Sequence, residues 1–117
     1  MTAEQICLVI EHNVRGIGTE DDVQRRIASA LQVQGVDHLR EHRLDKASRI
    51  DFMVGTIGVE VKTGGGISAV IRQLHRYAEF DTVSELVLVT TRTALARVPT
   101  ELNGKRVRVA LLLGGIL

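Results

Sequence analysis

Two acidic residues and a lysine, spaced as on β-strands, are the residues of this sequence best suited to chemistry. Asp51 and Glu60 each lie inside a short segment of alternating apolar residues, where acidic side chains are disfavoured. Gly55 between the two segments predicts a hairpin that brings the carboxylates side by side on one face. Two carboxylates so close repel each other unless a cation lies between them. Mg²⁺ is the expected cation, with Mn²⁺ as a substitute, because it accepts one or two carboxylates and keeps several waters.

Lys62 follows Glu60 by two positions, so both side chains are expected on the same face of a strand. An ammonium there can hold the attacking water, favour hydroxide, or stabilise charge that develops on a phosphate. A Glu-x-Lys triplet alone is common on solvated strands and indicates nothing. Asp51, placed across a glycine turn within the same apolar alternation, strengthens the functional interpretation. Together the three residues meet the requirements for phosphodiester hydrolysis.

The same residues fall in a pattern that resembles the PD-(D/E)XK nuclease superfamily. The pattern runs R-I-D-F-M-V-G from Arg49 and then V-E-V-K up to Lys62. Ile50 stands where the name of the motif has proline, a position that varies in the family. The resemblance covers roughly residues 19–112 and implies an α/β, restriction-endonuclease-like fold with an αβββαβ core.

The resemblance also assigns roles. It implies that Asp51 and Glu60 are metal ligands, that Lys62 is the catalytic lysine, and that the carbonyl of Val61 completes the metal shell. Gln73 and Tyr77, in Q-L-H-R-Y, resemble the Q-x-x-x-Y element of RecB-like nucleases. In that family the glutamine supports the active site, so Gln73 is a candidate catalytic residue and Tyr77 a candidate DNA contact. The alternative is the polar edge of an amphipathic helix.

Glu20 has two interpretations. It shares a predicted helix face with Val23, Ile27 and Leu31, so it points inward, where an unpaired glutamate is unexpected. Many members of the family carry a helix glutamate that reaches the metal, which would make Glu20 both a catalytic residue and a metal ligand. Alternatively, Glu20 is an acid at a helix start that complements the helix dipole. Glu11 is a weaker substitute for the helix glutamate.

Contact with DNA requires a local basic patch, because the net charge of the chain is only +1. Four basic residues near the proposed metal edge are candidates for binding phosphates. They are Arg40, Arg43, Lys46 and Arg49. A solvated strand and turn is the alternative interpretation of this cluster.

The periodicity of apolar residues predicts the elements that position these residues. Helices are expected at 3–13, at 20–34 after an N-cap at Thr19, at 67–80 and, as a short one, at 93–98. Strands are expected at 37–44, 49–54, 57–62, 85–91 and 106–113. In the hairpin, Ile50, Phe52 and Val54 should share an apolar face, opposite a charged face. An antiparallel meander followed by a crossover helix implies a mixed sheet with helices packed on it.

The chain has 117 residues and is expected to form one domain, 1–117. Cys7 is the only cysteine, which excludes an intramolecular disulfide and a cysteine zinc site and fits a reducing cytoplasm. No apolar run approaches the roughly 20 residues that span a bilayer, so no membrane association is expected. The apolar stretch 111–117 favours packing on a second copy, as a homodimer.

These features predict a Mg²⁺-dependent DNA nuclease, best matched by a small endonuclease of phage, repair or junction-resolving type. An exonuclease or single-strand nuclease is a rival, suggested by Gln73 and Tyr77. A second rival is a nucleic-acid-binding module with a nuclease-like fold and no activity. A small-molecule α/β enzyme is remote, because the sequence carries neither a phosphate-binding loop nor a nucleophile–base pair.

Overall fold

The computed structural model describes residues 1–114 of the chain. Its helices are α1 (Ala3–Asn13), α2 (Glu20–Val33), α3 (Ile67–Ala78) and the single 3₁₀ turn η1 (Leu95–Arg97). Its strands are β1 (Leu39–Arg43), β2 (Arg49–Val54), β3 (Ile57–Lys62), β4 (Glu85–Thr90), β5 (Glu101–Leu102) and β6 (Lys105–Leu111). These bounds lie within a few residues of the predicted ones. Only the two-residue β5 was not expected.

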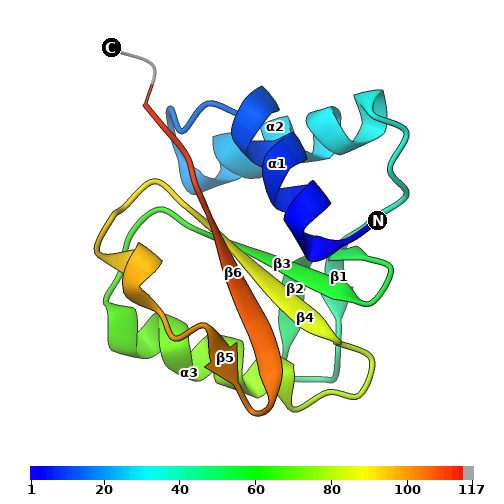
Figure 1. The fold of residues 1–117 in the computed structure, drawn as a ribbon, viewed down its shortest axis with the longest axis vertical. Coiled ribbons are helices and arrows are strands. Elements are labelled where there is room, and N and C mark those ends of the chain that lie inside the picture. Colours follow the sequence, from blue (N-terminus) through cyan, green and yellow to red (C-terminus); the bar gives the residue numbers. More distant parts are fainter. Residues whose placement is uncertain (115–117) are drawn as a thin grey trace.

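The strands form one mixed sheet in the order β1-β2-β3-β4-β6-β5. The first three strands pair antiparallel, whereas β3, β4 and β6 run parallel, with α3 as the crossover from β3 to β4. Helices α1 and α2 cover one face of the sheet, and α3 covers the other (Figure 1). The prediction of a mixed sheet flanked by helices is therefore confirmed. No helix within residues 1–114 is long and apolar enough to cross a membrane.

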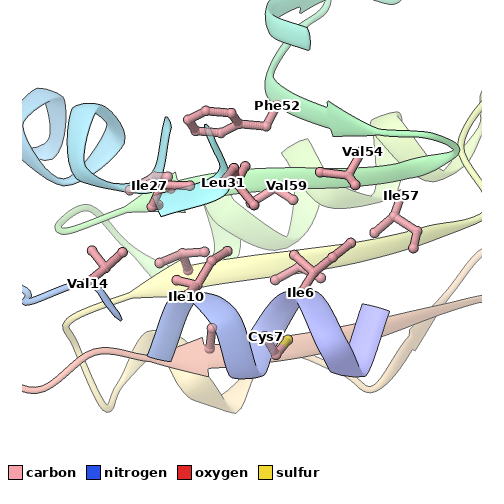
Figure 2. Packing of buried hydrophobic residues seen from close by; sticks show 14 of the residues in the cluster. Ile6, Cys7, Ile10, Val14, Ile27, Leu31, Phe52, Val54, Ile57 and Val59 are labelled. Carbon is pink, nitrogen blue, oxygen red and sulfur yellow. The ribbon is translucent and has the colours of Figure 1, made fainter. Parts of the chain in front are cut away.

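The apolar side chains form a separate core on each face of the sheet. Beneath α1 and α2, Ile10, Leu31 and Phe52 are fully buried (Figure 2). Beneath α3, Leu74 and Tyr77 pack with other buried side chains. Strand β4 supplies side chains to both cores in alternation, and its nearly continuous apolar run is typical of a strand buried on both faces.

The N-cap predicted at Thr19 is confirmed, and the other helix ends also follow local signals. Thr19 caps α2 in a reciprocal capping box with Asp22, and Thr2 caps α1 in the same way with Gln5. After α2, Gly35 adopts a φ of 70°, and the Val36 N–H donates to the Leu31 carbonyl over 2.8 Å. Only a residue without a Cβ adopts this conformation at low cost, which explains why the helix ends there.

The predicted arrangement of faces in β2 is wrong in two respects. Ile50 packs in the core beneath α3, whereas Phe52 and Val54 pack beneath α1 and α2. The alternation fails beside Glu41 of β1, which has a φ of 48° and lies between the pairs Arg40↔Phe52 and His42↔Ile50. A local distortion of this kind re-aims side chains on the neighbouring strand.

The second error concerns the face that was expected to be charged. Helix α3 covers that face, so it is a second core rather than a solvated surface. Met53 and Gly58 are buried there, and the side chain of Glu60 is only 3% exposed. The carboxylate therefore lies in the interior of the protein. Of the apolar stretch 111–117, residues 115–117 lie outside the described part of the chain.

Gly16 packs tightly where the α1–α2 loop meets the end of β6, and replacing it tests that packing. A Cβ at Gly16 would lie 2.5 Å from Thr91 Cγ2 and 3.1 Å from the Cβ of buried Leu112. We expect Gly16→Ala to lower the free energy of unfolding by about 1–3 kcal/mol in urea titrations. Gly64→Ala is the control, because a Cβ there meets nothing within 4 Å. An equal loss in both variants would contradict the packing argument.

Candidate active site

Asp51 and Glu60 lie where the β2–β3 hairpin opens, and each carboxylate reaches the backbone of the opposite strand. The N–H of Asp51 donates to Glu60 Oε1 over 3.1 Å, and the N–H of Val61 donates to Asp51 Oδ2 over 2.8 Å. The regular pairs of the ladder run from Val54↔Ile57 to Phe52↔Val59. The two acids continue this register as the next pair, and here side chains replace the bonds between backbones. The structure thus brings the two acids together in the interior of the sheet.

A tyrosine and a lysine hold the second oxygen of Glu60. The hydroxyl of Tyr77 lies 3.1 Å from Glu60 Oε2 and 2.9 Å from the carbonyl oxygen of Arg49. Lys62 Nζ lies 3.6 Å from the same Oε2, and its side chain is 25% exposed. Lys62 therefore shares the face of Glu60, as the spacing predicted, and it connects the buried carboxylate to solvent.

This environment favours the protonated form of Glu60. Burial and the charge of Asp51 raise the pKa of Glu60 to about 8, although Lys62 opposes the shift. Burial also raises the pKa of Asp51, against the stabilising hydrogen bond from Val61. Tyr77 has one proton and two acceptors within range. A protonated Glu60 can donate to the Tyr77 hydroxyl while that hydroxyl donates to the Arg49 carbonyl. A single proton on Glu60 therefore completes the hydrogen bonds around its buried carboxyl group at neutral pH.

Glu20 stands near these acids but is bonded elsewhere. Its Oε1 accepts a hydrogen bond of 3.0 Å from the N–H of Thr63, just after β3, and its charge contributes to the raised pKa of Asp51. Within residues 1–114, no three or more His, Cys, Asp and Glu side chains are grouped closely enough to hold a metal ion. Glu20 is therefore within electrostatic range of the pair without joining it. Glu11 lines a hollow with Leu111 and Leu113 instead.

The donor set is chemically suited to a hard dication. Asp51 and Glu60 supply two carboxylates, which is the number that Mg²⁺ commonly takes while keeping several waters. Val61 adjoins them through its N–H bond to Asp51, with its own carbonyl one peptide further along β3. A cation between the two acids would replace the proton of Glu60 and relieve the repulsion that raises its pKa.

The role predicted for Tyr77 is wrong, because a side chain only 1% exposed cannot contact DNA. Tyr77 instead positions Glu60 from α3, one turn beyond the half-buried Gln73. The sequence holds a signal for this burial: Tyr77 falls at helical spacing after Val70 and Leu74, on the face of α3 that meets the sheet.

The four basic candidates are all exposed, but they do not all share one place. Arg43 and Arg49 are direct neighbours across the β1–β2 ladder, and the Arg43 guanidinium donates to the carbonyl of Lys46 over 3.2 Å. The carbonyl of Arg49 accepts a hydrogen bond from Tyr77, so the backbone of Arg49 adjoins the site. Arg40 lies apart from these three, with its guanidinium carbon 5.5 Å from the ring centroid of Phe52.

Comparison with known proteins adds no relative: no family model matches the chain, and no curated protein or solved structure is significantly similar to it.

Glu60→Gln should make the protein more stable at alkaline pH. In the wild-type protein the folded state binds the Glu60 proton more tightly than the unfolded state does, with a pKa raised from 4.5 to about 8. Stability is therefore lost as the pH rises from about 4.5 through 8, by up to about 1.4 kcal/mol for each pH unit. An amide does not ionise, so the melting temperature of Glu60→Gln should change less over this range and exceed that of the wild type at about pH 9.

The control is Glu101→Gln, which alters an exposed glutamate and should keep the wild-type pH dependence. The buried-proton interpretation fails if Glu60→Gln and the wild type lose stability in parallel between these pH values.

Tyr77→Phe should be costly although it removes a single oxygen. The change leaves the Arg49 carbonyl without its buried donor and removes the hydroxyl that lies 3.1 Å from Glu60 Oε2. We expect a loss of about 1–3 kcal/mol in the free energy of unfolding, measured in urea near pH 6. Thr56→Val removes a hydroxyl that bonds to Ser84 at the surface and should cost much less. Similar losses in the two variants would show that the Tyr77 hydroxyl does not support the site.

Proposed function

We propose that this protein is a metal-dependent nuclease of the PD-(D/E)XK type that hydrolyses phosphodiester bonds in DNA. The observation that carries the proposal is the pairing of half-buried Asp51 with buried Glu60, with Lys62 Nζ 3.6 Å from Glu60. The order of elements supports it: a helix, a three-stranded antiparallel meander, a crossover helix and a parallel strand follow the αβββαβ order of that family.

The cost of this arrangement argues for function rather than structure. Two carboxylates inside a sheet lose hydration and repel each other, whereas apolar residues of similar size would pack there without that cost. Acids with raised pKa values, clustered beside a partly exposed lysine, are typical of catalytic sites. A solvated strand does not produce this pattern.

Each residue then has a distinct role. Asp51 and Glu60 would hold Mg²⁺ or Mn²⁺, with the carbonyl of Val61 as a further oxygen ligand. When bound, the metal polarises the phosphate and lowers the pKa of coordinated water. Lys62 orients the attacking water and stabilises negative charge on the phosphate. Tyr77 keeps Glu60 in place, with Gln73 beside it on α3. The basic residues Arg43, Lys46 and Arg49 hold the DNA backbone near the site, and Arg40 extends this contact along β1.

A non-catalytic nucleic-acid-binding module is the second candidate. It is favoured by the hydrogen bonds that already engage Asp51 and Glu60 and by the separate bond of Glu20 to Thr63. In this case the basic residues would bind DNA, and the acids would remain bonded to the backbone whether or not a metal is present.

The decisive experiment is cleavage of DNA by purified protein with Mg²⁺ or Mn²⁺. Supercoiled, linear, single-stranded, flap and four-way-junction substrates should be compared. We expect metal-dependent cleavage, with the rate in Lys62→Ala reduced roughly 100-fold or more while DNA binding is retained. Asp51→Asn should abolish both the cleavage and the rise in melting temperature that Mg²⁺ causes in the wild type.

Arg106→Ala is the matched control for loss of a cation, because Arg106 lies at the opposite end of the sheet from Lys62. Cleavage of closed circles would identify an endonuclease, whereas activity confined to linear ends would favour an exonuclease. DNA binding without cleavage in either metal would support the binding module. Equal cleavage by the wild type and Lys62→Ala would refute the role given to the lysine.

A further inference from the structure

The outer edge of the sheet beside β6 is open between Val107 and Leu113, whose carbonyl accepts a hydrogen bond of 2.9 Å from the N–H of Gly16. Strand β5 pairs with β6 only through Glu101↔Arg106 and Leu102↔Lys105. One more bond follows, from the Val107 N–H to the Thr100 carbonyl over 2.8 Å. Beyond Val107, no strand in the described part of the chain pairs with this side of β6 (Figure 1).

The direction of the backbone groups along this edge follows from the Val107 bond. Successive residues of a strand point their N–H and C=O groups to opposite sides. Because the Val107 N–H points away from β4, the N–H and C=O groups of Val109 and Leu111 also point outward. Such a row of unpaired groups readily accepts another strand.

The surroundings of this edge are apolar and carry opposite charges. Helix α1 lies over β4 and β6 (Figure 2), and its Leu8 is 47% exposed. A hollow of about 510 Å³ lies between α1, β6 and the segment 96–100, and its lining includes Leu8, Val107 and Val109 together with Glu4, Glu11 and Arg108. The Nε–H of Arg108 is buried and has no hydrogen-bond acceptor within residues 1–114. A second α1 with its own Glu4 and Glu11 would bring carboxylates to this place.

We infer that two copies of this chain associate through the β6 edges, pairing antiparallel about a two-fold axis at Ala110. In this register Val109 of each copy lies opposite Leu111 of the other, and the outward groups form four backbone hydrogen bonds. The small side chain of Ala110 allows close approach on the axis. The two α1 helices then lie on the same face of one continuous sheet and bury Leu8 between them.

The sequence of β6 favours this register over its neighbours. With Ala110 on the axis, Arg108 of each copy faces Leu112 of the other, which leaves its guanidinium free to turn toward the acids of the second α1. With Arg108 on the axis, two arginines would lie directly opposite each other, which is destabilising. The inference is independent of the nuclease proposal, since none of these residues belongs to the proposed catalytic site.

Sedimentation equilibrium of the full chain tests the inference. We expect the dimer to predominate at protein concentrations of about 100 μM, because a complex with a micromolar Kd is largely associated at that concentration. Val109→Pro removes one outward N–H but no bond to β4, so it should give a folded monomer. Leu8→Glu should weaken association at least tenfold by placing two charges between the α1 helices. Val33→Glu is the matched control, because Val33 is an 80% exposed aliphatic residue on α2.

A dimer that Val109→Pro and Leu8→Glu both dissociate, while Val33→Glu does not, supports the β6 interface. Circular dichroism melting of each variant shows whether a monomer is still folded, and Leu8→Glu decides the matter if Val109→Pro does not fold. A wild-type chain that is monomeric throughout this concentration range overturns the inference. So does a dimer that persists in folded Val109→Pro and Leu8→Glu.

Discussion

Half-buried Asp51 and buried Glu60 exchange hydrogen bonds with the backbone across the β2–β3 hairpin, and the rest of the site depends on that exchange. Each carboxylate accepts a bond from the opposite strand, so the ladder opens without leaving its N–H groups unpaired. Burial raises the pKa of both acids, and mutual repulsion raises that of Glu60 further. A proton relieves this repulsion in the protein alone, and a dication would relieve it more completely.

Helix α3 makes this arrangement possible by covering the acids. It brings Tyr77 to the buried oxygen of Glu60 and to the Arg49 carbonyl, so one hydroxyl ties the helix to both strands of the hairpin. Lys62 connects the buried oxygen with the exposed rim. The same helix explains why the pKa of Glu60 rises: its apolar residues, among them Leu74, exclude water from that face of the sheet. Positioning and desolvation therefore come from a single element.

The two lateral halves of the sheet carry different surfaces. The antiparallel half, β1 to β3, carries the acids, the lysine and the exposed arginines. The parallel half, β4 and β6, carries the open edge, where Val109 and Leu111 point their backbone groups outward. Association at β6 would leave the opposite edge, with Arg43 and Arg49, free to bind DNA. Under the two proposals, self-association and DNA binding would use opposite edges of the sheet.

The sequence by itself determined the local structure and singled out the candidate site residues. Capping at Thr19, the end of α2 at Gly35 and the turn at Gly55 follow from backbone preferences that neighbouring residues set, so the element order was predictable. Period-2 spacing was enough to place Lys62 beside Glu60. Tertiary structure alone decided the rest. The burial of Tyr77, the switch of Ile50 to the face of α3 and the bond of Glu20 to Thr63 all depend on elements distant in sequence. Alternation within one strand cannot reveal which helix will cover each face, or where a neighbouring strand distorts.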